Sequence, residues 1–257
     1  MNALHLVYEE YDQALLLQIA STISGQQTQH REASLELKDD AFFEWLSPSV
    51  WEVEAQLLAN RSQRAEGTLG WVLELEEFRK WRVGNLENSK STPAQTLWLN
   101  GLPGTGKSTI SAYLYDLLLH QYPDATILHF FCKSGTPGLT TAHNIVRTLC
   151  YQLTQKDPFY HRYLQKKQDL PSPGRLETLI LLFNTLIKDP ISKGPQESDI
   201  FILLDGLDEL EDTSSQAGQP SYASRTEIEA LLEELVQIPR AKILITSRSS
   251  PELKKIL

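Results

Sequence analysis

The spacing of apolar residues divides the chain into two parts with different periodicities. Residues 1–88 have no runs of β-branched residues, and their apolar positions follow a helical period. In the segment 4–19, apolar side chains recur every three or four positions, at Leu4, Tyr8, Tyr11, Leu15 and Ile19. This spacing predicts a helix with one apolar face.

Two further helices are predicted in this first part. One begins at Ser47, a good N-cap residue, with Pro48 at its first helical position, and runs to Arg61. The other covers 67–82, where Trp71, Leu75, Phe78 and Trp81 repeat the helical spacing. Such aromatic stripes are typical of a core or of a partner-binding surface. We therefore expect an α-helical N-terminal region, 1–88, that either binds a protein partner or braces the rest of the chain.

After a turn-rich linker at 85–95, predicted strands and helices alternate. The predicted strands are 96–100, 126–132, 199–205 and 241–247, and the first of them is followed by a predicted helix at 107–121. The last two strands are mostly apolar, as strands buried on both faces are. A capping box from Ser224 to Glu227 predicts the start of another helix. The alternation predicts an α/β domain, 89–257, with a parallel sheet flanked by helices and a ligand site at the carboxyl ends of its strands.

Composition and charge exclude some classes of function. The 257 residues carry a net charge of −9, which argues against nonspecific nucleic-acid binding, because that depends on neutralising phosphates. The sequence has no apolar run of about 18 residues and no signal-peptide pattern at its start, so we expect no membrane span and a cytoplasmic location. Cys132 and Cys150 lack metal-ligand spacing and are interpreted as small buried residues in a reducing compartment.

The segment 100–109, NGLPGTGKST, carries the strongest chemical signal. Gly101 to Ser108 match the pattern G-x-x-x-x-G-K-[ST] between a predicted strand and a predicted helix. Glycines let successive N–H groups turn toward phosphate oxygens, and the start of the helix adds its positive end. Lys107 is expected to reach the β and γ phosphates, and Ser108 to hold Mg²⁺. The expected nucleotide-binding residues are Gly101, Leu102, Pro103, Gly104, Thr105, Gly106, Lys107, Ser108 and Thr109. The alternative is a glycine-rich turn without a ligand.

Acidic residues at the end of the third strand supply the second half of the predicted site. Asp205 follows four apolar strand residues and is expected to face Ser108 and hold the same magnesium ion. Asp208 and Glu209 follow within one turn, where one of them can polarise an attacking water as general base. Alternatively, these two acids form a solvated helix start.

Arg248 ends the last predicted strand, 241–247. A cation there can sense the γ-phosphate; the alternative is an ordinary surface arginine. This strand is expected to lie between the loop-bearing strand and the strand that ends at Asp205.

Four segments in this order, WLNGLPGTGKST, FFC, LLDGLDEL and ILITSR, resemble the NACHT domain of the STAND class of P-loop NTPases, in its fungal NOD-like receptor form. Residues 40–82 also resemble the helical segment that precedes this domain. The resemblance implies a five-stranded core sheet with the additional strand in the position just described. It implies ADP in the resting state, ATP in the active state, slow hydrolysis, and signalling in innate immunity or heterokaryon incompatibility.

Carried over by position, the resemblance makes Lys107 and Ser108 ligands of phosphate and Mg²⁺, and Asp205 the metal-side acid. It makes Asp208 and Glu209 the hydrolytic acids, with Arg248 as the sensor arginine. A segment before the first strand, 86–93, would border the adenine. The family continues into a helical domain, a winged-helix domain and repeats that are not found after Leu257, so we expect an excised piece or a natural truncation.

Three functions follow from these features. The first is an ATP/ADP-operated switch, a slow ATPase that forms a homo-oligomer on activation. The second is a scaffold in which nucleotide is structural. The third is a small-molecule kinase, although the arginines that its lid would need are few, namely Arg147, Arg162 and Arg175. No N-K-x-D motif follows Asp205, which favours adenine over guanine.

Overall fold

The computed structural model describes most of the predicted α/β domain and part of the N-terminal region. The described residues are 45–46, 49–83, 95–156, 160, 176–188, 199–210, 222–238, 241–249 and 253–256. The helix predicted at 4–19 and the helix start predicted at Ser47 and Pro48 lie outside them.

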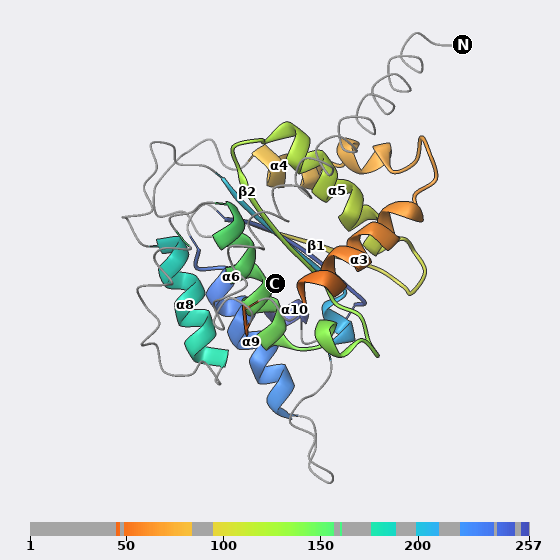
Figure 1. Ribbon diagram of the computed structural model, residues 1–257. Helices are drawn as coiled ribbons and strands as arrows, with labels where there is room; N and C mark the ends of the chain where they lie inside the picture. The colour runs from red at the N-terminus through yellow and green to blue at the C-terminus, as the bar shows by residue number, and fades with distance from the viewer. Residues whose placement is uncertain are drawn as a thin grey trace, which may run out of the picture.

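Four parallel strands form one sheet in the order β1-β4-β3-β2 (Figure 1). They are β1 (Gln95–Asn100), β2 (Thr126–Phe131), β3 (Ile200–Asp205) and β4 (Ala241–Ser247). Each strand lies within one residue of its predicted bounds, because an apolar run ends where polar turn residues begin. β4 lies between β1 and β3, which confirms the expected position of the additional strand. The resemblance implied five strands, whereas the described residues contain four.

Helices cover both faces of this sheet (Figure 1). Among the described residues after β1, the α-helices with stated bounds are α5 (Lys107–Gln121), α6 (Ala142–Lys156), α8 (Leu176–Lys188), α9 (Tyr222–Leu235) and α10 (Leu253–Ile256). Successive strand side chains point to opposite faces. Accordingly, Phe201 and Leu203 pack with α5, while Ile202 and Leu204 pack in the cluster that includes α6, α8 and α9. The α/β fold predicted from the sequence is confirmed.

Two predicted helix boundaries are wrong. α9 begins at Tyr222, so the cap predicted at Ser224 lies inside the helix. The single helix predicted over 67–82 is broken into a short 3-10 helix, η2 (Gly70–Glu74), and α4 (Glu76–Val83), because Leu75 between them is extended, with φ −63° and ψ 128°. The periodicity alone did not reveal this break.

Trp81 of α4 anchors the N-terminal segment to the sheet. Its side chain is buried, and its ring lies 5.7 Å from those of Phe78 and Phe201. Its indole N–H donates to the carbonyl oxygens of Gln95 and Ile243, each at 3.1 Å. A buried indole needs such a partner, so α4 is held against β1 and β4 by polar as well as apolar contacts.

The helix α3 (Val50–Ser62) packs on α5, the helix that follows the glycine-rich loop. The Arg61 guanidinium donates from Nε to both carboxylate oxygens of Asp116, at 3.0 Å each. The apolar residues Val53 and Leu57 of the same helix are buried in the larger core. The described part of the N-terminal segment is therefore built into the core of the α/β unit.

The two cysteines are buried and free, as interpreted from the sequence. Burial raises the pKa of the thiol of Cys132, which lies beside the acidic end of β3. None of the described helices has both the length and the apolar character that a membrane crossing requires.

Candidate functional site

The glycine-rich loop joins the end of β1 to the start of α5. Gly104 and Gly106 have φ values of +74° and +82°, a region that residues with a Cβ rarely adopt. No atom lies within 4 Å of the positions that their Cβ atoms would occupy. The loop therefore needs glycine at these positions for its backbone conformation, and it leaves open space beside them for a ligand.

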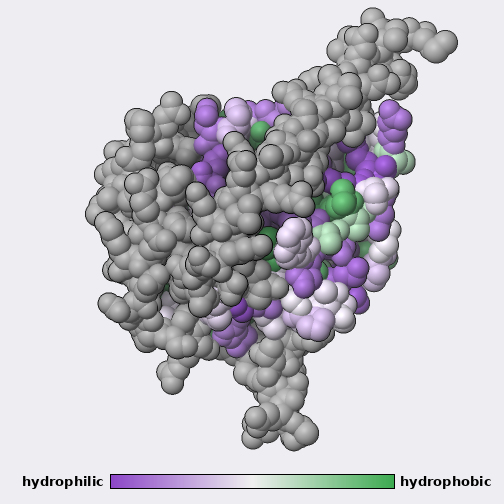
Figure 2. Space-filling model, viewed as in Figure 1, coloured by the Kyte–Doolittle hydropathy of each residue, from purple (hydrophilic) through white to green (hydrophobic). Residues whose placement is uncertain are grey.

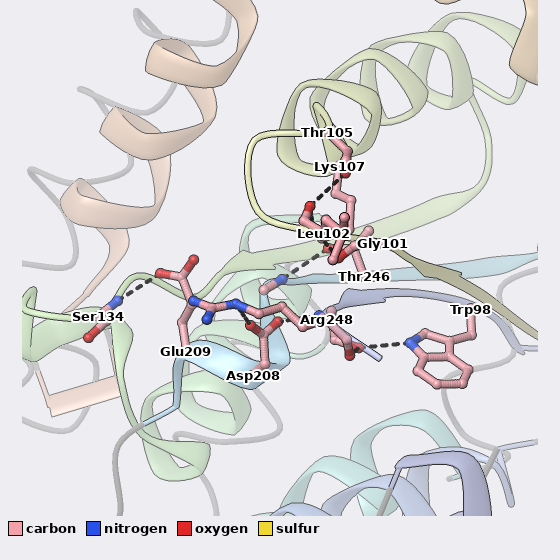
Figure 3. Close-up of polar contacts among 12 residues, drawn as sticks. Trp98, Gly101, Leu102, Thr105, Lys107, Ser134, Asp208, Glu209, Thr246 and Arg248 are labelled. Atoms are coloured by element: carbon pink, nitrogen blue, oxygen red, sulfur yellow. Dashed lines mark hydrogen bonds and ion pairs between the residues drawn. The ribbon is translucent and has the colours of Figure 1, made fainter. Parts of the chain in front are cut away.

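Lys107 is the first residue of α5, and its side chain folds back over the loop (Figure 3). Its ammonium group donates to the carbonyl oxygens of Gly101 and Leu102, each at 2.9 Å. The hydroxyl of Thr105 donates to the same Leu102 oxygen at 2.8 Å. A positive charge thus lies at the loop, held by carbonyl groups that a stronger anionic acceptor can replace.

Asp205, the last residue of β3, lies beside the first turns of α5. Its Oδ1 accepts hydrogen bonds from Ser111 Oγ at 2.8 Å and from Thr246 Oγ1 at 2.5 Å. Burial raises the pKa of this carboxyl, and hydrogen bonds from Ser108, Thr246 and Ser111 oppose that shift. The hydroxyl of Ser108 therefore lies close enough to the carboxyl of Asp205 to lower its pKa, a proximity that a shared metal ion requires.

The donor atoms at this point fit a magnesium ion. Mg²⁺ prefers hard oxygen ligands, and it is commonly held by one or two protein side chains plus substrate phosphates. Ser108 supplies a hydroxyl oxygen, and Asp205, a residue that is only 3% exposed, supplies a carboxylate oxygen. A cation here would compensate the charge that burial makes unfavourable.

Position 206, directly after Asp205, needs glycine for two reasons, its positive φ and the closeness of Cys132. Its φ is +70°, and a Cβ atom would lie 3.1 Å from the carbonyl oxygen of Cys132. Its N–H donates to Thr246 Oγ1 at 3.0 Å, the hydroxyl that also binds Asp205. Gly206 therefore allows β2, β3 and β4 to meet closely at the acid.

Replacement of Gly206 by alanine is expected to lower the free energy of unfolding by about 2 kcal/mol. Gly67 provides a matched control, because its φ is +72° but no atom lies within 4 Å of its Cβ position. Gly67→Ala should cost about 1 kcal/mol, from the backbone alone. Urea denaturation measures both values; equal losses in the two variants would contradict the contact with Cys132.

The acidic pair lies on a short 3-10 helix, η5 (Leu207–Glu209), and each acid has a partner (Figure 3). Asp208 Oδ1 accepts the main-chain N–H of Arg248 at 2.8 Å, and its Oδ2 pairs with Arg248 Nε at 2.8 Å. Glu209 Oε2 accepts the N–H of Ser134, in the loop after β2, at 3.0 Å. The structure thus joins Asp208 to Arg248 and directs Glu209 to another strand end.

Sequence reasoning missed four residues of this network. Ser111 and Thr246 bind Asp205, and Trp98 Nε1 donates to Ser247 Oγ at 2.8 Å. Ser111 lies three positions after Ser108 on α5, a helical spacing that places both on one side. Thr246 and Ser247 follow the apolar residues 243–245 at the end of β4, and Asp205 likewise follows an apolar run at the end of β3.

The other arginines considered for a kinase lid do not join this network within the described residues. Arg147 on α6 lies over the ring of Trp45, with its guanidinium carbon 4.3 Å from the ring centre. Arg162 and Arg175 lie outside the described residues.

A parallel sheet with an inserted strand, a glycine-rich loop that opens a helix and an acid at the end of β3 together define an α/β fold of the P-loop type. Within this class, residues 67–248 match the model of the family described as Nephrocystin 3, N-terminal, and the chain belongs to that family.

A curated relative agrees with this assignment. The chain is 26% identical over 145 residues to the Vegetative incompatibility protein HET-E-1 of Podospora anserina. The match covers 54% of this chain and 10% of that protein, so the chain spans only a small part of its relative. The family match and this relative confirm the resemblance to a NACHT-type domain of NOD-like receptors.

Proposed function

We propose that this chain is a nucleotide-operated signalling module that binds ATP or ADP with Mg²⁺ and hydrolyses ATP slowly. One observation carries the proposal: the buried carboxylate of Asp205 lies against the first turns of α5, where it accepts from Ser111 at 2.8 Å and where the nearby hydroxyl of Ser108 lowers its pKa. A hydroxyl and an acid from two different elements, next to an anion-binding loop, are what a nucleotide–magnesium complex needs.

The residues of the loop would bind the phosphates. Main-chain N–H groups between Gly101 and Gly106 and the positive end of α5 attract anions. Lys107 would exchange its two carbonyl partners for oxygens of the β and γ phosphates. Ser108 and Asp205 would hold the magnesium ion, which when bound neutralises phosphate charge.

Three further residues would make the site sensitive to the γ-phosphate. Arg248 would contact it, and Glu209 would polarise the attacking water; the role of Asp208 is developed below. ATP and ADP then make different contacts at the same site, and this difference in affinity can bias two states of the protein. From the resemblance to NACHT-type domains, we expect a homo-oligomer in the active state and a cytoplasmic location.

Hydrolysis by the isolated chain is expected to be slow, well below about one turnover per second. The phosphate-side groups are present, but the described residues offer no arginine beside the loop except Arg248. Release of phosphate from ATP under multiple-turnover conditions measures this rate. A rate of several turnovers per second by the monomer would contradict the proposal.

Binding itself is tested by identifying the nucleotide that co-purifies with the protein, using mass spectrometry of the denatured sample. Adenine nucleotide is the expected result, and calorimetry should show binding of ATP and ADP that strengthens with Mg²⁺. Failure to bind any nucleotide, or a clear preference for GTP, would overturn this function.

A scaffold function is the second candidate, and the outer face of α3 favours it. Trp51 and Leu58 are 84% and 63% exposed, and they lie seven positions apart on one side of the helix. In Figure 2 a small green patch lies over α3 with purple polar atoms around it. Exposed apolar residues of this kind often mark a protein-binding surface. In this case partner binding would persist without nucleotide.

A further inference from the structure

Arg248 is held at its main chain and at its side chain by the same carboxylate. Asp208 accepts the main-chain N–H of Arg248 on Oδ1 and pairs with Nε on Oδ2, both at 2.8 Å. The carbonyl oxygen of Arg248 accepts a third hydrogen bond, from Ser247 Oγ at 2.8 Å. A residue just beyond the end of a strand is thus fixed on both sides of its backbone.

Trp98 extends this arrangement into β1. Its indole N–H donates to Ser247 Oγ at 2.8 Å, and Ser247 is fully buried. A hydroxyl that accepts from one neighbour and donates to another has one orientation. The carbonyl oxygen of Ser247 also accepts the N–H of Gly101 at 3.3 Å. The groups that hold Arg248 are therefore joined to the first residue of the glycine-rich loop.

The guanidinium of Arg248 keeps its terminal amino groups available. Its side chain is 59% exposed, whereas that of Asp208 is only 16% exposed. Asp208 pairs with Nε, and within the described part of the chain the two terminal amino groups make no hydrogen bond. Those groups form the planar fork that binds two phosphate oxygens at once. Asp208 thus holds Nε of the guanidinium and leaves its two terminal amino groups available to a ligand.

The same contacts argue against Asp208 as the acid that polarises water. A general base needs an oxygen directed at the water, yet Oδ1 of Asp208 accepts the main-chain N–H of Arg248 and Oδ2 is paired with its Nε. Glu209 uses only Oε2 in its contact with Ser134. Of the two acids, Glu209 has the less committed carboxylate.

We propose that Asp208 and the Trp98–Ser247 pair are positioning groups that orient Arg248 toward the phosphate end of a nucleotide bound at the glycine-rich loop. This rests on the nucleotide binding proposed above. The pair and Asp208 act through Arg248, so they should affect the triphosphate more than the diphosphate and should have no effect once the arginine is removed.

The test compares the affinities of a non-hydrolysable ATP analogue and of ADP, both with Mg²⁺, by calorimetry. Arg248→Ala and Asp208→Ala should each lower the affinity for the analogue by about tenfold and leave the affinity for ADP within about twofold of the wild-type value. Adding Asp208→Ala to Arg248→Ala should cause no further loss, because residues that act as a unit are not additive. Additive losses, or equal losses for both nucleotides, would overturn the proposal.

Trp98→Phe removes the indole N–H together with part of the ring, and it gives an independent variant. It should lower the affinity for the ATP analogue by about threefold when made in the wild-type chain, and it should have no effect on that affinity when added to Arg248→Ala. Trp71→Phe makes the same chemical change at a ring that is 56% exposed, and it should alter neither affinity. An effect of Trp98→Phe on ADP equal to that on the analogue would count against the proposal.

Hydrolysis separates the two roles of Asp208. If Asp208 only positions Arg248, adding Asp208→Ala to Arg248→Ala should not lower the rate further in single-turnover experiments at saturating ATP. If Asp208→Ala instead abolishes hydrolysis there while analogue affinity is unchanged, Asp208 is the water-polarising acid and the proposal is wrong. If the wild-type chain binds neither nucleotide, the proposed function itself is overturned. If the wild type binds both nucleotides but the variants weaken them equally, only the positioning proposal is overturned.

Discussion

Replacement of Lys107 by alanine is expected to weaken the binding of both ATP and ADP by at least about 100-fold. In the structure the ammonium group already lies over the loop, where it donates to the carbonyl oxygens of Gly101 and Leu102. Alanine removes the positive charge that would pair with the phosphates, and charge-assisted hydrogen bonds are the strongest of their kind. Calorimetry with each nucleotide and Mg²⁺ measures the loss.

Lys80→Ala is the matched control for this variant. Lys80 lies on α4, is 74% exposed and pairs with Glu76 one helical turn away. Its loss should leave nucleotide affinity unchanged and alter stability by less than about 0.5 kcal/mol. If Lys107→Ala binds nucleotide as well as Lys80→Ala does, the loop is not a phosphate site.

The same variant separates the switch from the scaffold. If nucleotide operates a switch, Lys107→Ala should lose nucleotide-dependent assembly as well as nucleotide. If the protein is a scaffold that docks partners through its N-terminal helices, the variant should still bind them, because Trp51 and Leu58 lie on the exposed side of α3 and are not part of the loop. Size-exclusion chromatography with light scattering, with and without ATP, distinguishes the two.

Replacement of Asp205 by asparagine is expected to abolish the increase in ATP affinity that Mg²⁺ produces, which we put at about tenfold or more in the wild type. Asparagine keeps an oxygen that can accept from Ser111 and Thr246, but it removes the charge that would attract the cation. Titration of ATP in Mg²⁺ and in EDTA measures the difference. A tenfold magnesium effect that persists in Asp205→Asn would contradict the assignment of Asp205 as a metal-side acid.

The stability of Asp205→Asn provides a second readout without nucleotide. Burial raises the pKa of Asp205 above its ordinary value. For such a carboxyl, stability falls as pH rises from the unfolded pKa to the folded one, because the buried charge is unfavourable. The variant lacks this loss, so at neutral pH without metal its free energy of unfolding should be no lower than that of the wild type. Asp124→Asn, at an exposed position, controls for the substitution itself.

Much of the site was predictable because its chemistry lies in short, continuous segments. The loop from Gly101 to Ser108 and the acid at Asp205 each sit at the end of an apolar run. In a parallel sheet such ends meet at one edge. The contact between Ser108 and Asp205 follows from these two facts, even though 97 positions separate the residues in the sequence.

The partners of Asp208 and Glu209 could not be predicted in this way. Several orientations are open to an acidic side chain just after a strand, and spacing along the chain does not choose among them. Arg248 lies 40 positions after Asp208, and Ser134 lies 75 positions before Glu209. Only the order of the strands and the turn at Gly206 bring these groups within reach.

The sequence by itself determined the alternation of strands and helices, the glycine-rich loop and the acid that faces it, because periodicity and turn residues act locally along the chain. The tertiary structure decided which groups hold Arg248, where Trp81 binds, and that the helix predicted over 67–82 breaks at Leu75. These outcomes depend on the packing of elements distant in sequence, where burial of an aromatic ring or pairing of a charge outweighs local preference.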